Sequence, residues 1–135
     1  MAYSTIPKGN LHMNPVIYTG NGSTQSITGV NFQPDLVWLK NRDAAANHQL
    51  QDAVRGKSGS NYYYIQSDTS SAQGVQADSD GVNTLGTDGF TVGYTNSPAW
   101  NENGTDYVSW NWKAGTGQGS PNTDGSINTT YTSVN

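Results

Sequence analysis

The residues that could carry out hydrolysis are few in this 135-residue chain, and they are not paired. Glycoside hydrolysis normally needs two carboxylates at a defined separation. The only glutamate, Glu102, stands between Asn101 and Asn103 in an expected loop, so no second acid shares a strand face with it. No serine occupies a G-x-S-x-G turn, and the two histidines fall in the N-terminal arm and at a loop edge. We therefore predict that the chain is not an enzyme.

Carbohydrate binding is the other chemistry that the residue types allow. It needs aromatic rings that stack on sugar faces, and amides that hydrogen-bond to hydroxyl groups. Trp100, Asn101 and Asn103 supply such groups in one loop, and Tyr63 supplies a ring within residues 62–64. The alternative is that Trp100 caps the core and the tyrosines fill a sheet edge, because large aromatic side chains are usually buried. The residues alone leave both interpretations open.

Metal binding has weaker support. Asp78, Asp80 and Asp88 lie in or near one polar stretch, and carboxylate oxygens are ligands that Ca²⁺ prefers. Their spacing does not match a calcium-binding EF-hand loop, however, and Asp-Gly pairs are typical of turns. The chain has no cysteine, which excludes disulfides and thiolate metal sites. We predict neither a metal nor a cofactor.

The elements that would position these residues are short β-strands. Alternation of apolar and polar residues predicts strands, with turn residues between them, over 16–19, 24–28, 35–42, 48–55, 62–65, 90–94 and 106–115. Asn21-Gly22 is typical of a hairpin turn, and residues 66–87 read as a long polar loop. No segment predicts a stable helix. The pattern favours an all-β fold, an antiparallel β-sandwich.

The sequence also predicts three parts in the chain. An N-terminal arm covers residues 1–14, the sandwich domain covers 15–114, and a Gly/Ser/Thr/Asn-rich tail or linker covers 115–135. Within the tail, residues 127–134 are either a weak strand or a segment that pairs with another subunit.

Residues 106–115 are expected to form a main wall of the core. Read with a period of two, one face carries Val108, Trp110 and Trp112, and each large aromatic side chain can bury about 150–250 Å². The opposite wall is expected from strands 35–42 and 90–94. The predicted core residues are Leu36, Trp38, Phe90, Val92, Val108, Trp110 and Trp112.

The composition of the chain argues against some classes of binding partner. Only 12% of the residues are charged and the net charge is −4, which argues against a nucleic-acid binder with its basic patch. No apolar run is long enough to cross a membrane. A neutral surface rich in Asn, Ser, Thr and Gly suits extensive contact with neighbouring subunits.

Several blocks of the chain resemble a module of tailed-bacteriophage virion proteins. The resemblance spans about residues 16–127, and the order of its blocks is fairly specific. The blocks are Tyr18–Ile27, Phe32–Arg42, Asp52–Gly56, Asp88–Gly93 and Tyr107–Gly115. The matching residues belong to the framework, so the resemblance carries over no catalytic site.

This resemblance implies a concanavalin-like, jelly-roll sandwich in a tail fibre or a capsid-decoration protein on the exterior of the particle. The expected function is structural and non-enzymatic. It would act by adhesion to other virion proteins and to copies of itself, as a homo-oligomer, with the arm or the tail as anchor. The alternative is a lectin-like module that recognises a host-surface glycan through the residues around Trp100.

Overall fold

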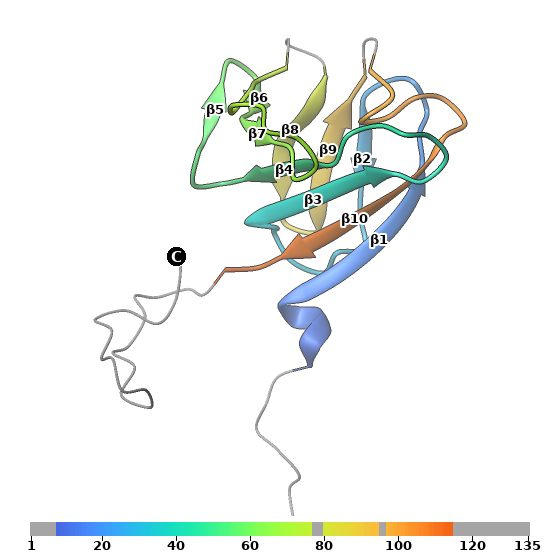
Figure 1. The fold of residues 1–135 in the computed structure, drawn as a ribbon. Helices are drawn as coiled ribbons and strands as arrows, with labels where there is room; N and C mark the ends of the chain where they lie inside the picture. The colour runs from blue at the N-terminus through green and yellow to red at the C-terminus, as the bar shows by residue number, and fades with distance from the viewer. Residues whose placement is uncertain (1–7, 77–79, 95–96, 115–135) are drawn as a thin grey trace, which may run out of the picture.

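Two packed antiparallel β-sheets form the described part of the chain, residues 8–76, 80–94 and 97–114 of a computed structural model (Figure 1). A short 3-10 turn, η1 (Gly9–Leu11), precedes the strands. The strands are β1 (Met13–Thr19), β2 (Gln25–Ile27), β3 (Leu36–Asn41), β4 (Gln49–Asp52), β5 (Lys57–Ser58), β6 (Asn61–Tyr62), β7 (Tyr64–Ile65), β8 (Gly81–Gly86), β9 (Gly89–Gly93) and β10 (Asp106–Trp112). Within these residues no helix is long and apolar enough to span a membrane.

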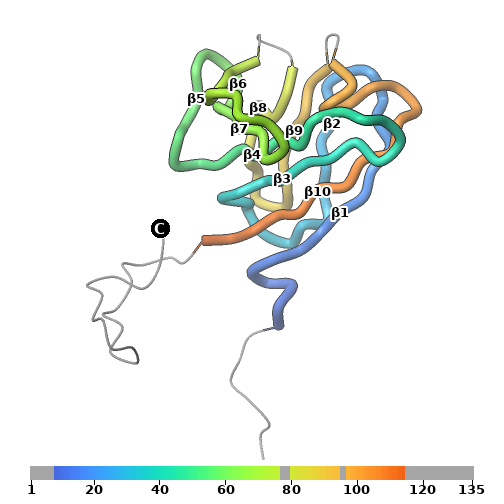
Figure 2. The backbone as a smooth tube through the Cα atoms, viewed as in Figure 1, coloured from blue at the N-terminus to red at the C-terminus, as the bar shows by residue number. Residues whose placement is uncertain are grey.

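The larger sheet has five strands in the order β1-β10-β3-β4-β7, and the smaller has three in the order β2-β9-β8. A two-stranded ribbon, β5-β6, lies beside them. Figures 1 and 2 show the five-stranded sheet in front and β2, β9 and β8 behind it. This arrangement confirms the predicted all-β, antiparallel sandwich. The finer jelly-roll or concanavalin-like assignment stays a prediction.

The core lies between the two sheets. It is filled by side chains from both sheets and from the loop before β10, namely Ile27, Val37, Leu39, Val82, Leu85, Phe90, Val92, Ala99, Trp100 and Tyr107. Tyr107 stacks on Tyr18 with 5.1 Å between ring centroids, and Phe90 and Tyr18 lie edge-to-face with 6.4 Å between theirs. Two expected core residues, Phe90 and Val92, therefore lie in the core.

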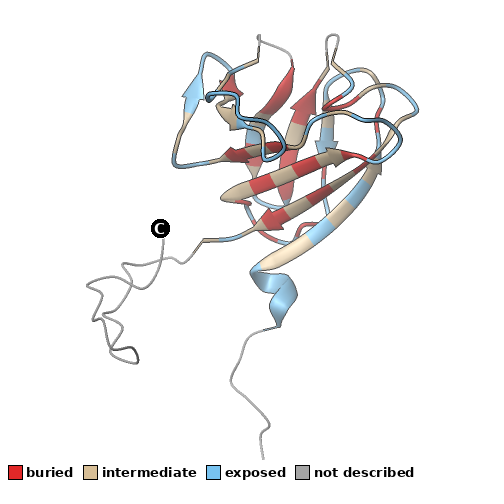
Figure 3. Ribbon diagram, viewed as in Figure 1, coloured by how far each residue is buried: buried red, intermediate tan, exposed pale blue. Residues whose placement is uncertain are grey.

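The other expected core residues lie elsewhere, because the two faces of the five-stranded sheet are reversed relative to the sequence prediction. The inner face of β10 consists of Tyr107, Ser109 and Asn111, each with no exposed surface. The opposite, partly exposed face carries Val108, Trp110 and Trp112. In β3, likewise, Val37 and Leu39 face the core while Leu36 and Trp38 lie outside. Figure 3 shows this alternation as bands along β3 and β10.

Hydrogen bonds to strand β1 explain how polar residues of β10 can be buried. Asn111 Nδ2 donates to the carbonyl of Asn14 at 3.0 Å and to Ser109 Oγ at 3.0 Å. Ser109 Oγ donates in turn to the carbonyl of Val16 at 3.4 Å. Burial of a polar group costs little when it is hydrogen-bonded, so hydrophobicity alone does not decide which face turns inward.

Three further expectations differ from the structure. Asn21-Gly22 does not close a hairpin, because β1 and β2 belong to different sheets. The expected loop 66–87 contains the whole of strand β8. Strand β1 begins at Met13, so residues 13 and 14 of the expected N-terminal arm belong to the sandwich. The possible strand at 127–134 and the tail from residue 115 lie outside the described residues.

Candidate binding surface

The loop residues that the sequence offered for stacking on a sugar do not form one exposed site. Trp100 is fully buried, and its ring lies edge-to-face with that of Tyr64, with 5.7 Å between the ring centroids. Asn103 is exposed, while Tyr63 is half-buried between β6 and β7. Burial therefore contradicts a stacking role for Trp100 and supports the alternative in which it fills the core.

Asn101 is fully buried and fastens two loops together. Its Nδ2 donates to Asn21 Oδ1 at 3.0 Å and to the carbonyl of Ser23. Its Oδ1 accepts from the backbone N–H of Asn21 at 3.2 Å, and its carbonyl accepts from Gly22 N at 2.9 Å. All four contacts are internal, so Asn101 holds the turn after β1 rather than a ligand.

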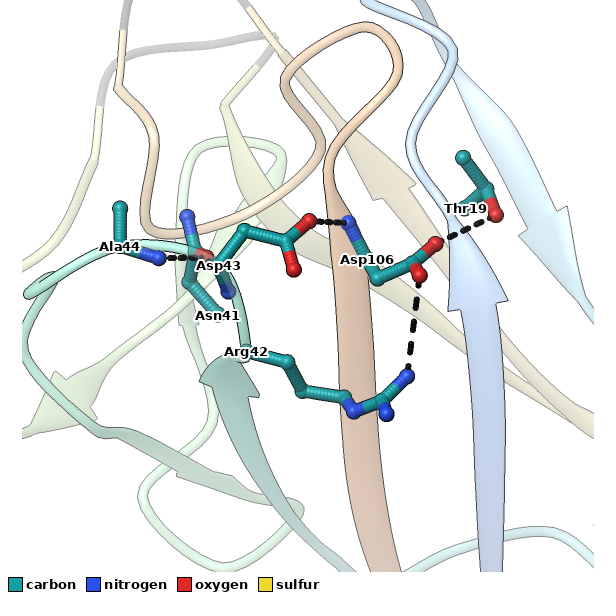
Figure 4. A network of polar contacts seen from close by, with 6 residues as sticks. All are labelled: Thr19, Asn41, Arg42, Asp43, Ala44 and Asp106. Atoms are coloured by element: carbon teal, nitrogen blue, oxygen red, sulfur yellow. Dashed lines mark hydrogen bonds and ion pairs between the residues drawn. The ribbon is translucent and has the colours of Figure 1, made fainter.

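The acidic residues around the start of β10 also make structural contacts (Figure 4). Asp43 Oδ2 accepts from the backbone N–H of Asp106 at 2.7 Å. Asp106 Oδ1 accepts from Thr19 Oγ1 at 2.7 Å, and its Oδ2 lies 3.8 Å from Arg42 Nη1. These contacts join the ends of β1, β3 and β10. Among the described residues, no three His, Cys, Asp or Glu side chains are grouped to hold a metal ion.

Two tyrosines in the core have perturbed acidities. Burial raises the pKa of Tyr107 to about 12, and the charges of nearby Glu102, Tyr94 and Asp43 act in the same direction, while its hydrogen bond from Glu102 lowers it. Burial raises the pKa of Tyr18 as well, with Tyr107 adding to the effect. Both hydroxyl groups already donate to backbone carbonyls, of Pro98 and Trp100 respectively. These groups therefore serve the fold as neutral donors.

Three partly exposed tryptophan side chains gather instead on the outer face of the five-stranded sheet. Directly paired residues lie on the same face, and one such row crosses all five strands. The row is Pro15, Trp110, Trp38, Leu50 and Ile65. We call this set, together with Ile17, Val108, Leu36 and Trp112 on the same face, the outer apolar face.

Trp38 lies at the centre of this outer apolar face. Its ring centroid is 5.6 Å from that of Trp110 and 6.5 Å from that of Trp112. Its Nε1 donates to His48 Nδ1 at 2.9 Å, which fixes the indole plane. Figure 1 is seen from the side of this face, and none of the described segments is drawn across β1, β10 and β3. Three tryptophan side chains therefore share one partly exposed surface.

A hollow of about 570 Å³ opens at one end of the outer apolar face. Its exposed lining is mainly apolar and consists of Asp35, Leu36, Asp52, Val54, Arg55, Trp112, Lys113 and Ala114. We call the four charged residues of this lining, Asp35, Asp52, Arg55 and Lys113, its rim. Asp52 and Arg55 form an ion pair through Arg55 Nε, and the backbone N–H of Arg55 donates to Asp52 Oδ1 at 2.8 Å. Asp35 Oδ2 accepts from Ala114 N at 2.7 Å. These bonds fix the rim.

Sequence reasoning missed this surface because it assigned its tryptophans to the core. One signal was available. Both faces of residues 36–39 are apolar, which indicates that the strand is covered on both sides. In the structure the core covers the face with Val37 and Leu39, while the face with Leu36 and Trp38 is partly exposed.

Comparison with known proteins gives a family but no characterised relative. No curated protein matches the chain, and no solved structure matches it. A family profile matches residues 8–135, which is nearly the whole sequence. The chain therefore belongs to the family described as a domain of unknown function, DUF7483.

Proposed function

We propose that the chain is a non-enzymatic structural protein of a tailed-phage virion, and that its copies adhere to one another through the outer apolar face. The observation that carries this proposal is the apolar row across all five strands of the larger sheet. Monomeric proteins rarely expose a large contiguous apolar surface, and such surfaces mark interaction sites. The virion assignment rests on the resemblance of the sequence blocks.

The polarity of the two sheet faces supports this proposal. The inner face of the larger sheet buries polar side chains, among them Gln49, Gln51 and Asn111, each with at most 2% of its surface exposed. The outer face of the same sheet carries three tryptophans, and at its two edges Ile17 and Ile65 are 69% and 40% exposed. Tryptophan is a residue type enriched at the buried centres of protein interfaces. A second apolar surface on this outer face would bury the tryptophan and isoleucine side chains that the single chain leaves partly exposed.

Oligomeric state tests the adhesion surface. Ile17→Glu places a charge on the outer apolar face at a position that is already 69% exposed, so the fold should tolerate it. Analytical ultracentrifugation should find an oligomer for the native chain and at least a tenfold weaker association for the variant. The control is Thr84→Glu, an exposed position on the smaller sheet, which should associate like the native chain. A native chain that stays monomeric at high concentration, or equal association of both variants, would refute this surface.

The virion assignment needs a separate measurement. Phage particles that encode this chain should contain it after purification, and mass spectrometry should find it in a fixed ratio to the major structural proteins. Labelling of intact particles with a specific antibody should then find the chain on the particle exterior. Its absence from purified particles would remove the virion assignment and leave the adhesion surface to be judged on its own.

A further inference from the structure

We propose that the hollow beside Trp112 is a binding site for a neutral sugar ring, a mono- or disaccharide of uncharged hexoses or N-acetylhexosamines. The site lies at one end of the outer apolar face and shares Leu36 and Trp112 with it. Its volume of about 570 Å³ falls in the range of small-molecule pockets, roughly 300–1,000 Å³. An apolar hollow with a few converging polar groups is also what such sites generally look like.

The floor of the hollow suits the apolar face of a sugar. Trp112 and Leu36 are paired neighbours on β10 and β3, and both side chains line the hollow. Val54 and Ala114 complete its apolar part. A pyranose ring presents several C–H groups on one face, and these groups pack on an indole while the hydroxyls point to the rim. Trp112 is held in place by the neighbouring ring of Trp38 at 6.5 Å, so the platform exists before a ligand arrives.

The rim offers both kinds of hydrogen-bonding group. Arg55 uses Nε for Asp52 and Nη2 for the carbonyl of Leu50 at 3.0 Å, and its Nη1 is shielded from solvent, so the guanidinium is held within the lining. The donor open to a ligand is the ammonium group of Lys113, an exposed residue that lines the hollow. The carboxylates of Asp35 and Asp52 accept backbone N–H groups but keep further lone pairs, because each oxygen has two. Hydroxyl groups donate and accept at once, so they match such a mixed rim.

Charge balance decides among the classes of ligand. The lining holds two carboxylates, Asp35 and Asp52, and two cations, Arg55 and Lys113, and the four charges sum to zero. An anion would meet the carboxylates, a cation would meet the cations, and a wholly apolar molecule would desolvate the rim without compensation. A neutral polyhydroxy ring avoids all three costs. This places carbohydrate recognition on β-strands 3, 4 and 10, away from the loop around Trp100.

Isothermal titration and saturation-transfer NMR on the intact chain test the site. The probes are glucose, galactose, mannose, N-acetylglucosamine and their disaccharides, with glucuronate and glucosamine as charged comparisons. We expect at least one neutral sugar to bind and the charged analogues to bind more weakly. Trp112→Ala should weaken binding at least tenfold. Tyr94→Ala is the matched control, since Tyr94 is a half-buried aromatic residue that lies outside both the hollow and the outer apolar face, and it should change affinity less than about twofold.

A second variant keeps the test independent of folding. Val54 is 76% exposed, so Val54→Arg should fill the mouth of the hollow without disturbing the core, and it should abolish binding. The site is overturned if no neutral sugar binds, if charged analogues bind as well as neutral ones, or if Val54→Arg binds like the native chain. Dissociation of an oligomer by Val54→Arg, with no sugar bound, would show that a second copy occupies the hollow. Ultracentrifugation of the same samples separates failure of this site from failure of subunit adhesion.

Discussion

Replacing Tyr107 by phenylalanine tests the reversed orientation of β10. The substitution keeps the ring that stacks on Tyr18 at 5.1 Å and removes only the hydroxyl group. That hydroxyl donates to the carbonyl of Pro98 at 2.8 Å and accepts from the backbone N–H of Glu102 at 2.9 Å. Tyr107 has no exposed surface, so water does not replace these bonds without rearrangement.

The magnitude follows from the two partners. The carbonyl of Pro98 keeps a second donor, Asn41 Nδ2 at 2.8 Å, so its lost bond should cost about 1 kcal/mol. The N–H of Glu102 loses its acceptor, and an unsatisfied group of this kind costs about 1–3 kcal/mol. We expect Tyr107→Phe to lower the free energy of unfolding by about 2–4 kcal/mol, which lowers Tm on the order of 10–20 °C in a domain of this size.

Urea denaturation followed by tryptophan fluorescence measures this loss at a fixed protein concentration, and the slope against urea should stay unchanged. Tyr62→Phe is the matched control. Tyr62 is half-buried with its ring 4.6 Å from Lys57 Nζ, so its free energy of unfolding should change by less than about 0.5 kcal/mol. An equally small change for Tyr107→Phe would refute the reasoning. It would mean that the hydroxyl faces solvent and that Trp110 and Trp112 turn inward.

Three further predictions concern the same fold. Burial raises the pKa of Tyr107 from 10.0 to about 12, so the full stability of the native state is present below pH 10. About 3 kcal/mol of the free energy of unfolding should be lost as pH rises through about 12. Alkaline titration of Tyr107→Phe should lack this loss. Gly89→Ala should prevent stable folding, since the new Cβ would lie 2.0 Å from the carbonyl oxygen of Ile27, whereas Gly104→Ala has open space and should cost only about 1–2 kcal/mol in thermal melts. Asn101→Asp removes the Nδ2 donor that holds the turn after β1 and should lower the free energy of unfolding by about 2–4 kcal/mol in urea titrations.

The strands themselves were largely predictable, because alternation over residues 36–41, 89–93 and 106–112 is a local property of the sequence. Strand β8 was not predictable. Its buried side chains Val82 and Leu85 are three residues apart, and the pairing with β9 shifts between Val82 and Thr84. A bulge of this kind breaks the period of two, so the segment reads as a loop.

The inward face of each strand was the part that local pattern could not decide. In β10 the alternation is compatible with burial of either face, and the large side chains of Trp110 and Trp112 favoured the face that in fact points outward. The structure buries Ser109 and Asn111 because carbonyl groups of β1, about 95 residues away in the chain, accept their hydrogen bonds. That information exists only after the sheet has assembled. The candidate site was missed for the same reason, since it consists of side chains assigned to the core.

The position of β10 between β1 and β3 has a consequence for how the protein acquires its fold. β1 and β3 never pair with each other, and β10 supplies the neighbour of both. A nascent chain that has not yet released Asp106–Trp112 from the ribosome therefore has a divided larger sheet and unpaired strand edges. Contacts this distant in sequence make folding slow, and exposed strand edges favour association between incomplete chains. The larger sheet can therefore close only after β10 has been synthesised, and the unpaired edges that favour misassembly are then covered.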